Sequence, residues 1–204
     1  FKTDSVSSFT DTLSFGENIS VAYSNADAKT FHSTGKELPD TVKVLTIDFT
    51  DDNATDSLNL LSAVHVSDSL VFVGGDLKNA GSVSLDASST VYIDNVNAGV
   101  DEVFNSEAYN LVYDNTGNKT VGSELNSSAI VNVFVQGNVQ LASNVTVNNL
   151  TVKDPFDLNT FALTITGEAV VLDETLDGSD NDAHVVFAGS AEQGVSGSTD
   201  QEFS

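Results

Sequence analysis

Hydrophobic residues along this chain recur in short alternating triplets. In Val71-Phe72-Val73 and in Val91-Tyr92-Ile93, the outer two side chains point to one face and the middle one to the other, as in a β-strand. Further triplets follow at intervals of about 20 residues, beginning at Leu111, Val131, Leu150 and Val170. This regular spacing is typical of a repeat fold.

Two further sets of apolar positions lie between these triplets. The second set is clearest at Leu45–Ile47, Val64–Val66 and Val145–Val147, and the third contributes one residue per repeat, such as Leu58 and Leu77. Asn, Asp, Ser and Gly separate the runs, and these residues favour turns. The sequence therefore predicts an all-β fold, a parallel β-solenoid with three-sided coils of about 19–20 residues stacked about 4.8 Å apart.

The solenoid prediction specifies which residues stack in a column and which fill the interior. We expect the first residues of the triplets, from Val71 to Val170, to form one column along the stack. The expected interior residues are Val73, Ile93, Tyr113 or its neighbours, Val133 and Val152. The phase of the repeat slips at 101–106 and at 134–136, where we expect bulges or loops. A β-sandwich or jelly roll is the alternative, because it also has short strands and frequent turns.

The ends of the chain differ from the regular repeats. Residues 1–41 are out of phase, and we expect them to form an N-terminal cap or strands exchanged with a neighbouring subunit, because a solenoid end exposes unpaired backbone groups. The coils are expected over 42–189. Residues 190–204 are mostly Ser, Gly, Glu, Gln and Asp, which predicts a polar tail.

The charge of the chain limits the classes of partner that we expect it to bind. The formal net charge is −23, with 30 acidic residues against 7 basic ones. Such a chain repels phosphate backbones, which argues against nucleic-acid binding. No apolar run approaches the ~20 residues that span a bilayer, so we expect no membrane insertion. There is no cysteine for a disulfide scaffold, and we expect a secreted or cell-surface protein.

Acidic residues tend to follow the predicted strands. On adjacent coils, Asp94 and Asp114 would lie about 4.8 Å apart, where two carboxylates repel unless a cation bridges them. Calcium accepts six to eight oxygen ligands in loose geometry. Aspartate also ends strands without any metal, but we expect calcium as a cofactor. The candidate ligands are Asp94, Asp114, Asp154, Asp173, Asp177, Asp180 and Asp182.

Signs of catalysis are sparse in the sequence. His65 lies between Val64 and Val66, so we expect its side chain to point away from the core and to face solvent or a turn. No Gly-x-Ser-x-Gly motif is present, and no histidine has a spacing that suggests a catalytic base. We therefore expect no enzymatic activity. A β-helix enzyme that acts on polysaccharides with paired carboxylates is the alternative, although the chain has no arginine for an acidic sugar.

Part of the chain resembles a known family. The segments Asn110–Val121, Asn144–Val152 and Asp157–Gly167 are similar to the repeats of large secreted bacterial surface adhesins. The resemblance covers roughly 110–170, and it breaks at Asp154-Pro155-Phe156 and in the higher acidity of this chain. It implies surface display and an adhesive or structural role, with no catalytic residues.

These observations lead to two expected functions. The first is a calcium-stabilised structural subunit that self-associates into a surface filament or surface layer. The second is an adhesin module that binds a carbohydrate or another surface ligand.

Overall fold

The protein is represented by a computed structural model. It describes residues 18–25, 31–34, 38–49, 56–79, 82–94, 108–115, 117–178 and 182–198. The chain divides into two compact units, Phe1–Tyr109 (unit 1) and Asn110–Ser204 (unit 2). Each unit consists of parallel strands stacked as β-solenoid coils, with about seven turns in all. The predicted fold class is therefore confirmed. Within the described ranges, no helix is long and apolar enough to cross a membrane.

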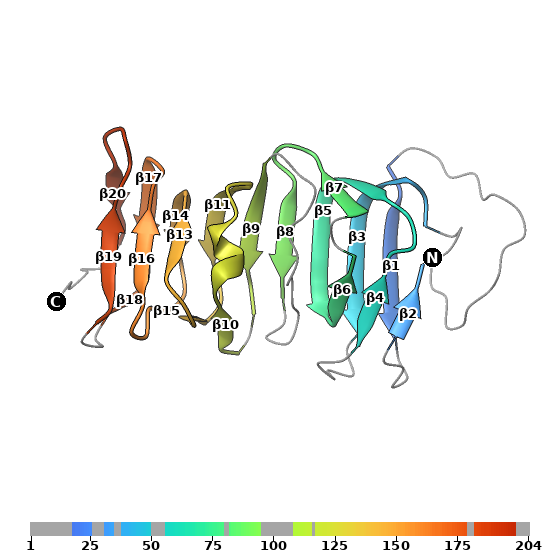
Figure 1. Cartoon of the computed structure of the whole chain (residues 1–204), viewed down its shortest axis with the longest axis horizontal. Coiled ribbons are helices and arrows are strands. Elements are labelled where there is room, and N and C mark those ends of the chain that lie inside the picture. Colours follow the sequence, from blue (N-terminus) through green and yellow to red (C-terminus); the bar gives the residue numbers. More distant parts are fainter. Residues whose placement is uncertain are drawn as a thin grey trace, which may run out of the picture. The chain divides into compact units, whose positions relative to one another are not determined.

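Unit 1 contains two sheets (Figure 1). The order of the larger sheet is β1-β3-β5-β8, with β7 also beside β5, and that of the smaller sheet is β2-β4-β6. All of these pairs are parallel. The strands are β1 (Ser20–Asn25), β2 (Phe31–Ser33), β3 (Thr41–Phe49), β4 (Ser57–Asn59), β5 (Val64–Gly74), β6 (Asp76–Lys78), β7 (Val83–Leu85) and β8 (Thr90–Ile93).

Unit 2 has the three sides that the sequence predicts. Its sheets run β9-β11-β14-β17-β20, β10-β12-β15-β18 and β13-β16-β19. The elements are β9 (Tyr109–Tyr113), β10 (Lys119–Val121), the 3-10 helix η2 (Ser123–Asn126), β11 (Ile130–Val135), β12 (Val139–Leu141), β13 (Val145–Val147), β14 (Asn149–Val152), β15 (Phe156–Asp157), β16 (Ala162–Ile165), β17 (Ala169–Leu172), β18 (Leu176–Asp177), β19 (His184–Phe187) and β20 (Gly194–Ser196).

In unit 1 the predicted column of side chains is wrong by one residue at β5. Val91 pairs with Leu70 rather than with Val71. Leu70 and Phe72 are 0% exposed, whereas Val71 and Val73 are only partly buried. The pairing of β5 with β3 shifts register at two points, and a shift of one residue exchanges the two faces of a strand.

In unit 2 the column agrees with the prediction only beyond β11. Leu150 pairs with Val170 as predicted, but on its other side it pairs with Val133 rather than with Val131. Val131 is partly exposed. The predicted interior residues that are buried are Ile93, Tyr113, Val133 and Val152.

Parallel pairing extends beyond both predicted limits of the solenoid. Strand β1 lies within the predicted cap and pairs with β3, with Val21 opposite Leu45. Strand β20 lies within the predicted polar tail and pairs with β17. The rest of the predicted cap up to residue 17, and the predicted slip at 101–106, lie outside the described residues.

Asparagine side chains connect neighbouring coils. In unit 2, Asn132 Nδ2 donates to Asn110 Oδ1 at 2.7 Å, and Asn149 Nδ2 donates to Asn132 Oδ1 at 3.1 Å. In unit 1, Asn79 Nδ2 donates to Asn59 Oδ1 at 2.7 Å. Because an amide both donates and accepts, one residue type can repeat along the stack. These ladders add side-chain hydrogen bonds to those of the backbone.

Candidate functional site

The last coil of unit 2 ends each of its three sheets. Strands β18, β19 and β20 each have one neighbour, on the side of the preceding coil. In the described part of the chain, no strand pairs with their outer edges. The edge of a sheet can offer backbone donors and acceptors to another strand.

The hydrophobic core of unit 2 also reaches this surface. Phe187 is opposite Ile165, and Val195 is opposite Val170. The two inner residues are at most 1% exposed, whereas Phe187 is 44% and Val195 is 53% exposed. Phe187 and Val195 therefore continue the core positions of unit 2, but none of the described strands forms a further coil over them. We call β18, β19 and β20 the terminal coil.

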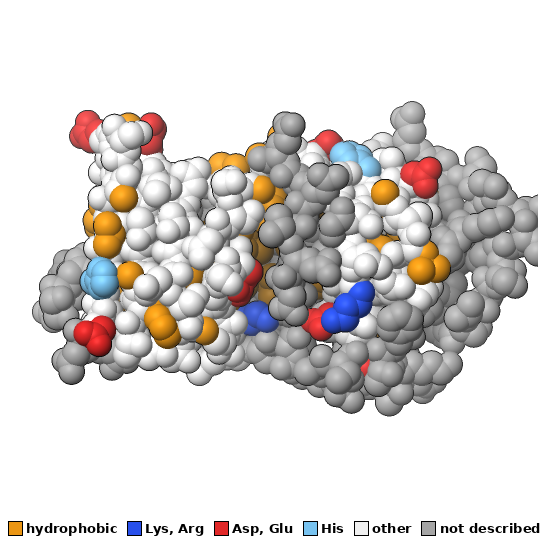
Figure 2. All heavy atoms as spheres, viewed as in Figure 1, with side chains coloured by type: hydrophobic (Ala, Val, Ile, Leu, Met, Phe, Trp, Pro, Cys, Tyr) orange, Lys and Arg blue, Asp and Glu red, His pale blue; other side chains and the backbone are white. Residues whose placement is uncertain are grey.

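Figure 2 shows hydrophobic side chains gathered where β19 and β20 lie, at the end of unit 2. Val186, which is 38% exposed, adds to the apolar surface of β19. Unit 1 differs at its first strand, because Val21 and Tyr23 of β1 are 6% and 5% exposed. Exposed residues at core positions are thus a property of the terminal coil and not of every edge strand.

The predicted calcium ligands are spread over both units. Asp94 follows β8 in unit 1, Asp114 follows β9 in unit 2, and both are exposed, as is Asp182. Asp180 lies outside the described residues. Among the residues that the structure describes, no group of three or more Asp, Glu or His side chains is placed to hold a metal ion. The structure therefore does not gather the described candidates into such a cluster.

Stacking in unit 2 places other residues beside the predicted aspartates. The register of β14 with β17, continued by one residue, sets Lys153 level with Asp173. Asp154 is therefore one position away from Asp173 along the coil. Asp177 is opposite Asp157, which was not among the candidates. Both pairs are 20 residues apart, so they agree with the predicted length of a coil.

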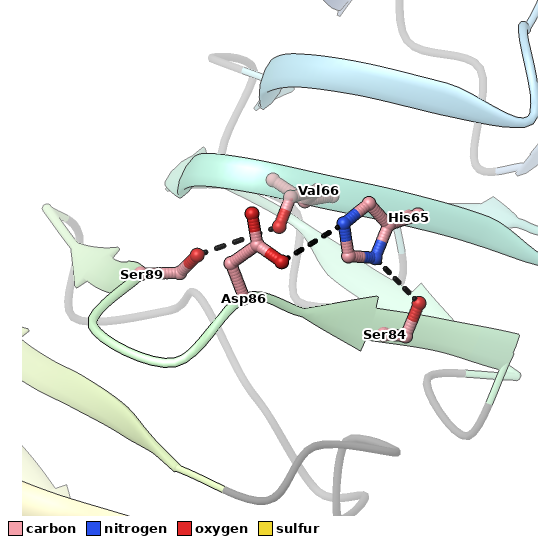
Figure 3. Close-up of polar contacts among 5 residues, drawn as sticks. All are labelled: His65, Val66, Ser84, Asp86 and Ser89. Atoms are coloured by element: carbon pink, nitrogen blue, oxygen red, sulfur yellow. Dashed lines mark hydrogen bonds and ion pairs between the residues drawn. The ribbon is translucent and has the colours of Figure 1, made fainter.

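His65 has polar partners on both ring nitrogens (Figure 3). Its Nδ1 lies 3.0 Å from Ser84 Oγ, and its Nε2 lies 3.2 Å from Asp86 Oδ1. His65 and Ser84 are opposite each other in the pairing of β5 with β7. The His65 side chain is 36% exposed, in agreement with the expectation that it points away from the core, but its two polar partners were not expected. Its 19-residue spacing from Ser84, about one repeat, was the sequence signal for this contact.

Histidine, serine and aspartate also form the catalytic triad of serine hydrolases, but His65, Ser84 and Asp86 are arranged differently. The acid of a hydrolase triad is buried, whereas the Asp86 side chain is 54% exposed. The backbone N–H groups of His65 and Asp86 are bonded to Asp40 and Val66 of neighbouring coils, so they do not stabilise an oxyanion. This geometry fits a structural role, in which His65 connects its strand to the neighbouring coil through Ser84 and Asp86.

Comparisons of the chain with protein-family models, with curated proteins and with solved structures gave no match. The function of the protein must therefore be inferred from the residues of this chain. Among the described residues, the terminal coil is the surface on which backbone edges and exposed core positions coincide.

Proposed function

We propose that this protein is an extracellular structural subunit that self-associates through its terminal coil. The observation that carries the proposal is the exposure of Phe187 and Val195, whose partners on the preceding coil are fully buried. Burying one large apolar side chain contributes about 1.5–3 kcal/mol. Covering both residues and pairing the strand edges would stabilise a complex.

The occupant that we propose is a second copy of this chain. A surface that covers the terminal coil must match the spacing of its strands and of its core positions. Another β-solenoid coil has this geometry, and each copy of the chain carries one. In a symmetric pair, the same residues of both copies would meet. The predicted surface filament or layer would need a second contact in addition to this one.

Sedimentation velocity of the purified chain at increasing concentration tests the proposal. We expect wild-type protein to form dimers or larger species. The double variant Phe187→Ser and Val195→Ser should remain monomeric, because it removes the apolar side chains but keeps the backbone. Leu61→Ser is the matched control, since Leu61 is 66% exposed and lies in unit 1.

Three outcomes would contradict the proposal. The first is a wild-type chain that stays monomeric at millimolar concentration. The terminal coil would then be covered by another segment or by a different partner, and not by a second copy. The second is a double variant that associates as wild type does. The third is a Leu61→Ser variant that loses association to the same extent. Circular dichroism must show that each variant retains its β structure.

A further inference from the structure

Asp56 in unit 1 has a buried carboxylate without a partner. The residue is 1% exposed, and neither Oδ1 nor Oδ2 has a hydrogen-bond partner. Asp48 Oδ1 is also buried without a partner. A carboxylate in this state is strongly unfavourable, and buried charges in proteins are normally paired or bound to a metal.

Both aspartates border the same corner of the solenoid. Asp48 is opposite Gly74 in the pairing of β3 with β5. The carbonyl oxygen of Asp56 accepts a hydrogen bond from the N–H of Asp76 at 2.8 Å. A Cβ atom on Gly75 would lie only 3.0 Å from that same oxygen. The Gly74–Gly75 corner between β5 and β6 is therefore in close contact with the backbone of Asp56 and level with Asp48.

The two lysines that the structure describes in unit 1 each lie beside another aspartate. Lys78 Nζ lies 3.5 Å from Asp76 Oδ2, and Lys43 Nζ lies 3.9 Å from Asp68 Oδ2. Protonation would remove the charge, but the resulting O–H and carbonyl would still be buried without hydrogen bonds. A compensating group must therefore contact both oxygens of Asp56.

We propose that Asp56 and Asp48 bind a calcium ion at the Gly74–Gly75 corner. Calcium accepts a carboxylate through both oxygens and fills its other positions with backbone carbonyls and water. Magnesium requires a stricter octahedral geometry and suits the site less well. The site is distinct from the ligands that the sequence predicted.

Thermal unfolding of the full chain in EDTA and in millimolar CaCl₂ tests the site. We expect calcium to raise the Tm of the wild type by on the order of 5 °C, and to raise it more than magnesium does. The Asp56→Asn variant should lose this shift. In EDTA it should melt above the wild type, because asparagine removes the uncompensated charge at nearly the same shape. Asp40→Asn is the control, since Asp40 is exposed in the same unit.

The wild type should therefore have the lower Tm in EDTA and the higher Tm in calcium, relative to Asp56→Asn. An equal calcium shift in wild type and Asp56→Asn would overturn the proposal, as would a wild type that does not respond to calcium or that responds equally to magnesium. If Asp56→Asn does not fold, Asp48→Asn takes its place. Titration calorimetry should then show one calcium fewer per chain than in wild type, and an unchanged stoichiometry would refute the site.

Discussion

At the scale of single residues, asparagine connects the coils of unit 2. Asn132 uses both ends of its amide, donating to Asn110 and accepting from Asn149. Asn149 Oδ1 also accepts a hydrogen bond from the N–H of Ala169 at 3.1 Å. All three asparagines are partly buried, where an unpaired amide is costly. The ladder therefore favours one register over slipped ones.

Asn132→Ala should destabilise the protein by about 1–3 kcal/mol, because it removes two hydrogen bonds, the one to Asn110 Oδ1 and the one from Asn149 Nδ2. Urea unfolding, followed by circular dichroism, measures this free energy. Asn138→Ala is the control, since Asn138 is exposed and should change stability by less than ~0.5 kcal/mol. Equal effects of the two substitutions would show that the ladder does not stabilise unit 2.

At the scale of elements, neighbouring coils approach closely at glycines. A Cβ atom on Gly137 would lie 2.2 Å from the carbonyl oxygen of Asn115 and 2.6 Å from its nitrogen. Because these are backbone atoms of the adjacent coil, no rotamer change relieves the clash. Around Gly178, by contrast, the nearest heavy atom lies 3.8 Å away.

Gly137→Ala should therefore lower the stability of the protein by at least ~1–3 kcal/mol, the usual range for overpacking a tight contact. Gly178→Ala is the matched control and should be close to neutral. Thermal melts of the two variants measure the difference. If Gly137→Ala melts at the wild-type temperature, the coils do not pack as closely as the structure shows.

The strands themselves could be predicted, but their register could not. Alternation identified β8, β14 and β17, because each has a buried face and an exposed face. Strand β5 has 11 residues, and its irregular pairing with β3 displaced the prediction at Val71 and Val73. A bulge depends on which backbone hydrogen bonds form between coils, and an alternating pattern does not encode them.

The same reason limited only part of the prediction of the candidate sites. Asp177 is opposite Asp157, one predicted coil length earlier, so the repeat alone could have identified this pair. Asp56 was missed because its burial comes from a corner between two sheets, and no periodic signal marks corners. Phe187 could have been noticed as an apolar residue in the last triplet before the polar end of the chain.

At the scale of the whole molecule, the net charge of −23 opposes any self-association. Two copies that meet through their terminal coils bring like charges together, and this repulsion is screened by salt over a Debye length of about 10 Å at 0.1 M. Apolar contacts between Phe187 and Val195 of the two copies do not share this sensitivity. The proposed association should therefore be favoured by salt.

We expect the association constant of the wild-type chain to rise at least about tenfold between 0.02 and 0.5 M NaCl, as screening reduces the repulsion. Sedimentation equilibrium at matched protein concentrations measures this change. The double variant Phe187→Ser and Val195→Ser should stay monomeric throughout, because reduced repulsion without an apolar contact gives no stable complex. Association that weakens as NaCl rises would show that charged groups attract the two copies, and it would argue against a contact formed by the core positions of the terminal coil.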